Sequence, residues 1–101
     1  MPYFLGRLIS PRPTFPMDIT DGEKKLMQEH VVYWTGFQEK GKMLAFGPVA
    51  DPKGFWGLGL FQVENELETK TLTDNDPVIR AGVGFSYEIY PMPQLKMAKS
   101  I

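Results

Sequence analysis

The stretch that decides the fold is TDGEKKLMQEHVVYWTGFQEKG, residues 20–41. At about 100° per residue its apolar side chains, Val32 excepted, fall on one arc roughly 160° wide, while most of its lysines and glutamines face the other way. A stripe of this width normally lies against a sheet or a second helix. The arc comprises Glu23, Leu26, Met27, His30, Val31, Tyr33, Trp34 and Phe37. The pattern therefore predicts one long amphipathic helix with a histidine turned inward.

Both ends of this helix carry local signals. Thr20 followed by Glu23 is a capping box, in which each side chain satisfies a backbone N–H at the start of the helix. Gly41 suits the left-handed conformation that ends many helices, and a lysine on each side of it complements the helix dipole. We therefore expect the helix to begin just after Thr20 and to end just before Gly41.

His30 is the only histidine in the chain, and its position has two interpretations. It is either a half-buried side chain with one structural hydrogen bond or an acid–base residue. In both cases a buried neutral imidazole needs a partner for its N–H and another for its lone pair. Leaving either group unmet costs about 1–3 kcal/mol. The partner of His30 is therefore the first residue to look for.

Short apolar segments on both sides of the helix are predicted to be strands. They span residues 3–9, 43–49, 55–64 and 85–90. The second and third are joined by Asp51-Pro52-Lys53-Gly54, which places proline at the second and glycine at the fourth position of a turn. These two strands therefore form a hairpin.

A second, shorter helix lies between the third and fourth strands. Asn65 and Glu68 form another capping-box pattern, which opens a helix over residues 66–73. Asp76 then caps a further turn that begins with Pro77. The order strand-helix-strand-strand-helix-strand, with right-handed crossovers, predicts an α+β fold: a ferredoxin-like βαββαβ plait with a four-stranded antiparallel sheet and its helices on one face.

Three features leave room for a ligand or a partner. The loop from Ser10 to Ile19 holds three prolines and is longer than the connection needs, so it lies over a cleft or is a plain surface loop. Gly57 and Gly59 share one face of the third strand and leave space for a helix, a ligand or a second subunit. The sheet face away from the helices is apolar enough to meet a second sheet or a ligand.

Composition bounds the class of protein. We expect one domain over residues 1–101, with residues 91–101 as a C-terminal tail. The net charge is −1 and the basic residues are scattered, which argues against nucleic acid or an acidic membrane as partner. The absence of cysteine excludes disulfides, thiolate metal sites and a cysteine nucleophile. We find neither a signal peptide nor a membrane-spanning apolar run, so we expect a cytoplasmic protein.

The order and spacing of the motifs resemble the YciI-like (YCII-related) family, over about residues 3–91. The matching residues are His30, Gly41, Gly47, Pro48, Asp51, Gly54, Asp76, Pro77, Ala81 and Gly82. Members of that family are similar to dimeric α+β-barrel proteins, so the resemblance implies a homodimer. It also implies an active site with a His–Asp pair, which here is His30 and Asp76. A related chlorinated-hydroquinone dehydrochlorinase is one of the few members with a known role.

Physical chemistry makes this pair reasonable. Asp76 lies at the start of a tight turn, where backbone N–H groups favour an ionised carboxylate. Such a carboxylate beside His30 would fix its tautomer and suit it to general acid–base work. Asp76 is also a structural cap, and both roles can hold at once. Further candidates for contact with a substrate are Tyr3, Arg12, Trp34 and Pro48.

We therefore expect acid–base chemistry, without a metal or other cofactor, on a small organic molecule, with aromatic and cyclic compounds among the candidates. His30 would move the proton and Asp76 would orient it, in an elimination, an isomerisation or a hydrolysis. Two alternatives stay open: a non-catalytic ligand-binding or structural dimer with a buried His–Asp link, and a metal-free oxygenase of the related dimeric-barrel kind. A pocket that reaches His30 from solvent favours the enzyme, and a sealed pair favours the link.

Overall fold

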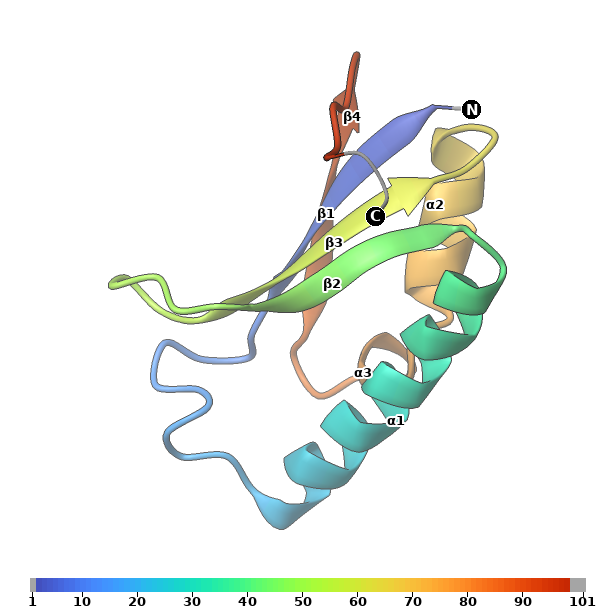
Figure 1. The fold of residues 1–101 in the computed structure, drawn as a ribbon. Helices are drawn as coiled ribbons and strands as arrows, with labels where there is room; N and C mark the ends of the chain where they lie inside the picture. The colour runs from blue at the N-terminus through green and yellow to red at the C-terminus, as the bar shows by residue number, and fades with distance from the viewer. Residues whose placement is uncertain (1, 99–101) are drawn as a thin grey trace.

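The computed structural model describes residues 2–98, and its elements follow the predicted order (Figure 1). The strands are β1 (Tyr3–Ile9), β2 (Met43–Val49), β3 (Trp56–Gln62) and β4 (Ser86–Met92). The helices are α1 (Asp21–Glu39), α2 (Glu66–Asp74) and α3 (Pro77–Arg80). The last three residues of the expected tail lie outside the described residues.

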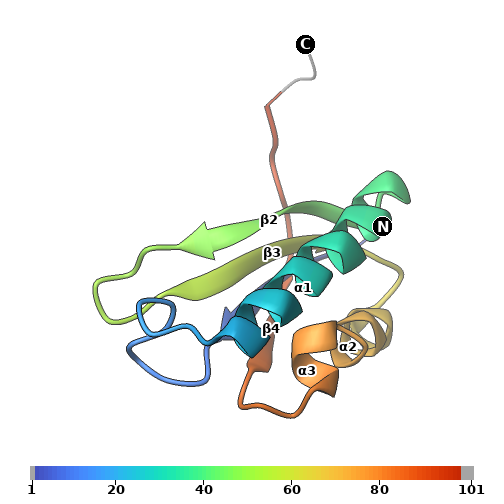
Figure 2. The same ribbon diagram turned by 90° about the horizontal axis from the view of Figure 1, so that it is seen from below.

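The sheet has the strand order β2-β3-β1-β4, and every neighbouring pair is antiparallel. All three helices lie on one side of it (Figure 2). This arrangement confirms the ferredoxin-like plait. The fourth strand continues past its predicted end and includes Pro91. Pro91 and Pro48 both lie in edge strands, where a missing N–H disturbs the ladder least.

Helix α1 has the predicted ends. Thr20 and Glu23 form the capping box, with the Glu23 N–H donating to Thr20 Oγ1 at 3.1 Å and the Thr20 N–H donating to Glu23 Oε1 at 2.9 Å. Gly41 follows the helix in the left-handed region, with φ of 76°. The expected inward arc is wrong at Val31, which is 49% exposed. Val31 borders an open cavity beside α1, where none of the described core side chains covers it.

The core forms where α1 and the sheet meet. One cluster consists of Phe4, Trp34, Met43, Phe61 and Val63. A second consists of Leu8, Phe15, Val78 and Phe85. Phe15 comes from the proline-containing loop, and its ring meets that of Phe85 edge-on at a centroid distance of 5.4 Å. The loop is therefore packed into the structure and is not a plain surface loop.

The start of α2 differs in part from its prediction. Asn65 caps the helix as expected, accepting from the Glu68 N–H at 2.8 Å. The Glu68 carboxylate, however, accepts from the backbone N–H of Glu64 and pairs with Lys42, so the second half of the capping box is absent. Lys42, at the entrance of β2, draws this carboxylate away from the Asn65 N–H. Among the described residues, no helix is long and apolar enough to cross a bilayer.

Candidate functional site

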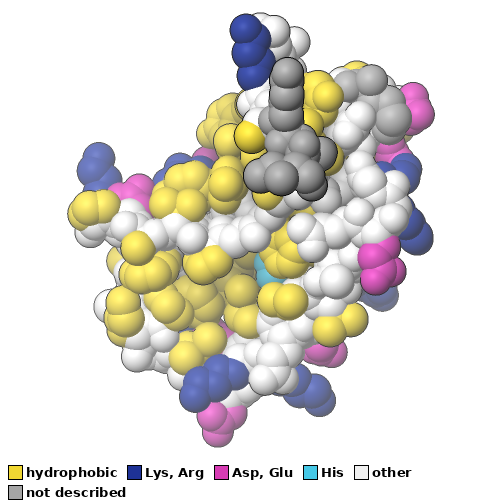
Figure 3. Space-filling view, in the orientation of Figure 1, with side chains coloured by type: hydrophobic (Ala, Val, Ile, Leu, Met, Phe, Trp, Pro, Cys, Tyr) yellow, Lys and Arg dark blue, Asp and Glu magenta, His cyan; other side chains and the backbone are white. Residues whose placement is uncertain are grey.

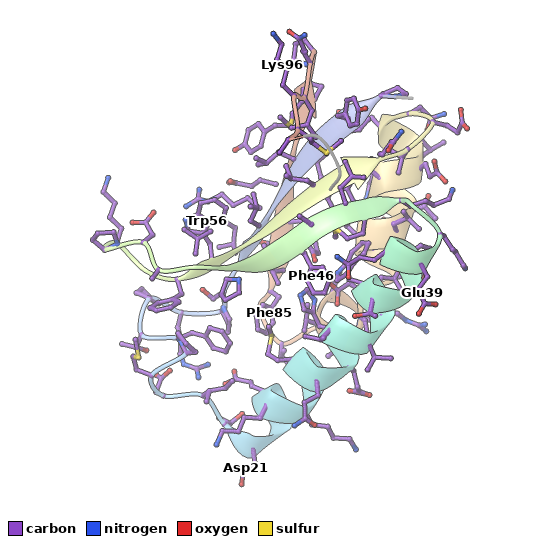
Figure 4. All side chains as sticks on the ribbon, viewed as in Figure 1. Asp21, Glu39, Phe46, Trp56, Phe85 and Lys96 are labelled. Carbon is purple, nitrogen blue, oxygen red and sulfur yellow. The ribbon has the colours of Figure 1, made fainter. Side chains whose placement is uncertain are left out.

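A cavity of about 460 Å³ lies between α1 and the β2–β3 hairpin, with the loop over residues 10–19 on one side. Its lining includes Phe15 from the loop, His30 from α1, Phe46 from β2 and Gly57 from β3. Figure 3 shows the hollow from outside, with the histidine visible in its depth and hydrophobic side chains around it. Figure 4 shows Phe46 and Phe85 in the space between the sheet and α1. The cavity therefore reaches His30 from solvent.

The glycines of β3 shape the floor of this cavity. A Cβ at Gly57 would lie 3.1 Å from the Cβ of Leu8, and one at Gly59 would lie 3.1 Å from the Phe61 ring. Both glycines also line the cavity. The space left by the missing side chains of the two glycines is therefore filled in part by Leu8 and Phe61, and the rest belongs to the cavity.

The described residues that line the cavity carry no charged side chain except the titratable His30. Their other polar side-chain atoms have partners. The Ser10 hydroxyl donates to the Phe55 carbonyl at 2.7 Å, and the Trp56 indole donates to Asp51 at 3.2 Å. The Trp34 and Tyr87 groups donate to Asp76, behind the cavity wall.

Among the side chains of the described lining residues, the free polar atom is His30 Nε2. Its ring is held by Nδ1, which lies 2.7 Å from Asp76 Oδ2. His30 Nε2 has no hydrogen-bond partner among the described residues. Since no unpaired polar atom of a described side chain is fully buried, Nε2 must be accessible, and it is open to the cavity that His30 lines. The Phe46 ring packs edge-on against the imidazole at a centroid distance of 6.1 Å. These contacts leave Nε2 to meet whatever occupies the cavity.

The Asp76 carboxylate lies within hydrogen-bond distance of four donor groups. Its Oδ1 accepts from the Val78 N–H at 3.1 Å. Its Oδ2 accepts from Trp34 Nε1 at 2.8 Å and from the Tyr87 hydroxyl at 2.6 Å, and meets His30 Nδ1. Asp76 has no exposed surface. An ionised carboxylate only accepts and has room for about four hydrogen bonds, so these donors fit the ionised form.

The titration of the group agrees with this geometry. Burial alone would raise the pKa of the Asp76 carboxyl, because a low-dielectric site disfavours charge. Hydrogen bonds from His30, Tyr87 and Trp34 outweigh burial and hold that pKa below its ordinary value. Burial and the nearby Asp76 charge raise the pKa of the Tyr87 phenol, which therefore keeps its proton. The site thus holds a charged carboxylate against a protonated phenol.

The ionised carboxylate determines which nitrogen of His30 carries the proton. Because Asp76 Oδ2 can only accept, the proton between the two groups lies on Nδ1. The neutral imidazole then presents the lone pair of Nε2 to the cavity. Chemically, this arrangement can take a proton from a bound molecule, and the resulting imidazolium can return it.

The residues predicted from the sequence separate into two groups. His30 and Asp76 meet, and Trp34 and Pro48 both line the cavity. Tyr3 and Arg12 are not among the lining residues. Tyr3 begins β1, on the sheet face opposite the helices. The Arg12 guanidinium is instead occupied by two carboxylates, those of Glu23 and Asp18.

Arg12 has a structural place in the loop. Its two terminal nitrogens donate to the two carboxylate oxygens of Glu23, each at 2.7 Å, and its Nε donates to Asp18 at 2.9 Å. This bidentate pair also explains why Glu23, a charged residue on the inward arc of α1, is tolerated with only 8% of its surface exposed. Arg12 thereby fastens the loop that carries Phe15 to the start of α1.

Sequence reasoning gave too little weight to two residues of the site. Tyr87 has a partial signal in the sequence, because the alternation of residues 85–89 places it on one face with Phe85 and Ile89, without identifying the side of the sheet that the helices cover. Its contact with Asp76 depends on the pairing of distant elements. Phe15 has no such signal, since loop conformation cannot be deduced from residue spacing.

Within residues 2–98, no three His, Asp or Glu side chains gather as metal ligands would.

The family assignment agrees with this site. Residues 5–93 match the model of the YCII-related domain. The chain belongs to the YCII-related family. The match runs from within β1 to just past the end of β4, so it covers both elements that supply the His–Asp pair, and the resemblance seen in the sequence is confirmed. No curated protein matches this YCII-related chain.

Proposed function

We propose that this YCII-related domain is an acid–base enzyme that acts on a small, uncharged, mainly apolar organic molecule. The observation that carries the proposal is the free basic atom His30 Nε2 at the wall of a cavity whose described lining is mainly apolar. A charged ligand would lose its hydration there without meeting an Asp, Glu, Lys or Arg side chain among the described lining residues, which is costly. An uncharged ligand, aromatic or cyclic rings included, loses little on entering.

The chemistry follows from the pair. Nε2 takes a proton from the bound molecule, and the imidazolium that forms is stabilised by the Asp76 carboxylate at Nδ1. Returning the proton to another atom of the same molecule gives an isomerisation. Delivering it to a leaving group gives an elimination, and taking it from water gives a hydrolysis. Asp76 stays ionised throughout and serves to orient and stabilise the ring.

A second candidate is a non-catalytic binder of small apolar ligands. It is favoured by one observation: the side chains of the described lining residues offer no unpaired donor to stabilise a developing negative charge, since Nε2 of the neutral ring accepts. The cavity that reaches His30 argues against the sealed structural link. Turnover or proton exchange separates the enzyme from the binder.

The experiment is a screen of uncharged metabolites incubated in D₂O with the wild type and with His30→Gln, read by mass spectrometry. Proton abstraction at carbon yields either a product or a heavier isotopologue of the starting molecule, even where no net reaction follows. We expect the wild type to label or convert a compound that His30→Gln leaves unchanged. Equal labelling by both proteins would remove His30 from the mechanism, and saturable binding without labelling would favour the binder.

We also propose that the chain forms a homodimer through the sheet face that points away from the helices. The register places Leu5 beside Leu60 and Tyr90 on this face, and Arg7 beside Leu58. This face is therefore largely apolar, although it does not pack against the helices. A second copy of the same sheet would cover it with side chains of the same kind.

A further inference from the structure

Tyr87 is the point at which the sheet holds the His–Asp pair. His30 comes from α1, and Asp76 comes from the short connection before α3. Tyr87, from β4, donates its hydroxyl to Asp76 Oδ2 at 2.6 Å, the shortest of the hydrogen bonds that this carboxylate makes. The same hydroxyl accepts from Trp34 Nε1 at 3.2 Å. Helix α1, the connection before α3 and the sheet thus meet at one oxygen.

This convergence restricts the carboxylate. With only Val78 and His30 as donors, the Asp76 side chain would have one donor for each oxygen and would be free to tilt. The Tyr87 hydroxyl and the Trp34 indole approach the same Oδ2 as His30. Two such donors at one oxygen stabilise its negative charge and fix its direction. The oxygen that faces Nδ1 is therefore held both charged and aimed.

We propose that Tyr87 is a positioning residue for His30, acting through Asp76. Its hydroxyl keeps Asp76 Oδ2 in line with Nδ1, so that the proton stays on Nδ1 and the basic atom of the ring is Nε2. This inference rests on the proposed function, since it concerns the same base. It adds a residue from the sheet to the His–Asp pair, whose own members come from α1 and from the connection before α3.

The chain offers a matched control for this role. Tyr33 is also a partly buried tyrosine, and its hydroxyl donates to the Leu72 carbonyl at 2.6 Å. Its ring packs on Trp34 at a centroid distance of 4.8 Å, so it neighbours the site without donating to Asp76. Tyr87→Phe and Tyr33→Phe each remove one phenol hydroxyl and one hydrogen bond. They differ in whether that bond reaches Asp76.

The experiment measures the reactivity of His30 with diethyl pyrocarbonate, which transfers its ethoxycarbonyl group to a neutral imidazole nitrogen. Because the chain has one histidine, fragmentation of the modified peptide separates the His30 adduct from any adduct on a lysine or tyrosine. We expect Tyr87→Phe to slow the reaction by about fivefold, the factor that corresponds to losing one hydrogen bond of ordinary strength. The Nδ1–H proton resonance should move in the same variant. Tyr33→Phe should leave both unchanged.

Equal reaction rates and an unmoved Nδ1–H resonance in Tyr87→Phe would overturn the positioning role alone. If wild-type His30 does not react at all, the proposed function fails as well, so the two failures are distinguishable. If Tyr87→Phe does not fold, the wild type decides. The Tyr87 hydroxyl and His30 Nδ1–H protons both point at Asp76 Oδ2, so they should show a mutual nuclear Overhauser effect, and its absence would contradict the inference.

Discussion

His30 Nδ1 lies 2.7 Å from Asp76 Oδ2, although 46 residues separate the two in the sequence. The contact joins the middle of the longest helix to the cap of the shortest one. It does two things at once, because Asp76 caps α3 with one oxygen and meets His30 with the other. The structural and the functional interpretation of Asp76 therefore describe the same residue.

Replacing Asp76 should lower stability more than an ordinary polar substitution does. In Asp76→Asn the side-chain NH₂ group replaces one of the two carboxylate oxygens. In one orientation of the amide it faces the Val78 N–H, and in the other it faces the Trp34 and Tyr87 donors, so two donors oppose each other in either case. We expect a loss of about 3 kcal/mol in the free energy of unfolding, measured by urea denaturation. Asp74→Asn, whose exposed carboxylate pairs only with Lys70, is the control and should change by less than about 1 kcal/mol. Similar losses in both variants would argue against a tightly bonded Asp76.

Two glycine-to-alanine substitutions should change the free energy of unfolding in opposite directions. A Cβ at Gly6 would lie 2.5 Å from Cε2 of the fully buried Phe61 ring, so Gly6→Ala should destabilise by about 1–3 kcal/mol. Gly36 lies within α1 with no atom within 4 Å of the added Cβ. Gly36→Ala should therefore stabilise by about 0.5–1 kcal/mol, because alanine is the better helix former. Thermal denaturation of both variants measures the two signs, and a stable Gly6→Ala would contradict the packing of Phe61.

The Arg12–Glu23 pair should make stability depend on acid. Hydrogen bonds from Arg12 lower the pKa of the Glu23 carboxyl from 4.5 to about 2. Since the folded pKa is depressed, the stabilisation is present above pH 4.5 and is lost as the pH falls toward 2. Glu23→Gln should remove this part of the pH dependence, as measured by unfolding at a series of pH values. Arg12→Gln should remove the Arg12 part of this dependence together with the part that Arg12 gives to Asp18, and the double variant should lose less than the sum of the two single variants. Additive losses would mean that the two side chains act independently.

The proposed dimer predicts that a charge on the open sheet face separates the subunits. Leu60 lies on that face beside Leu5 and does not line the cavity. Leu60→Glu should therefore sediment as a monomer where the wild type sediments as a dimer. Val32→Glu places the same charge on the outer side of α1, where Val32 is 73% exposed, and should leave the dimer intact. A monomeric wild type would end this proposal.

Local signals predicted the elements well. The bounds of β1 and β2 follow from short apolar runs that end in proline or a turn, and the ends of α1 follow from Thr20 and Gly41. Predictions failed where a distant residue intervenes. Lys42 draws the Glu68 carboxylate out of its capping box. The strand β4 continues through Pro91 because its outer edge needs no further ladder bond.

The candidate site was less accessible to sequence reasoning. The pairing of Asp76 with His30 was predicted from the family resemblance. Physical chemistry made the pair reasonable, but the residues between the two carry no pattern that indicates the contact. The alternation of residues 85–89 puts Tyr87 on the same face of β4 as Phe85. Which side of the sheet that face takes, and the donation of Tyr87 to Asp76, depend on how β4 pairs with β1 and how α3 packs beneath the sheet. Arg12 was expected to contact the substrate. Its guanidinium instead pairs with the carboxylates of Asp18 and Glu23, and residue spacing gave no sign of these two contacts.

The most direct measurement of the central claim is the pair of ¹⁵N chemical shifts of the His30 ring in the wild type, with the ring neutral. We predict a protonated Nδ1 and an unprotonated Nε2 whose shift responds when an uncharged ligand fills the cavity. A neutral ring with its proton on Nε2, or an Nε2 that no cavity ligand affects, would contradict it.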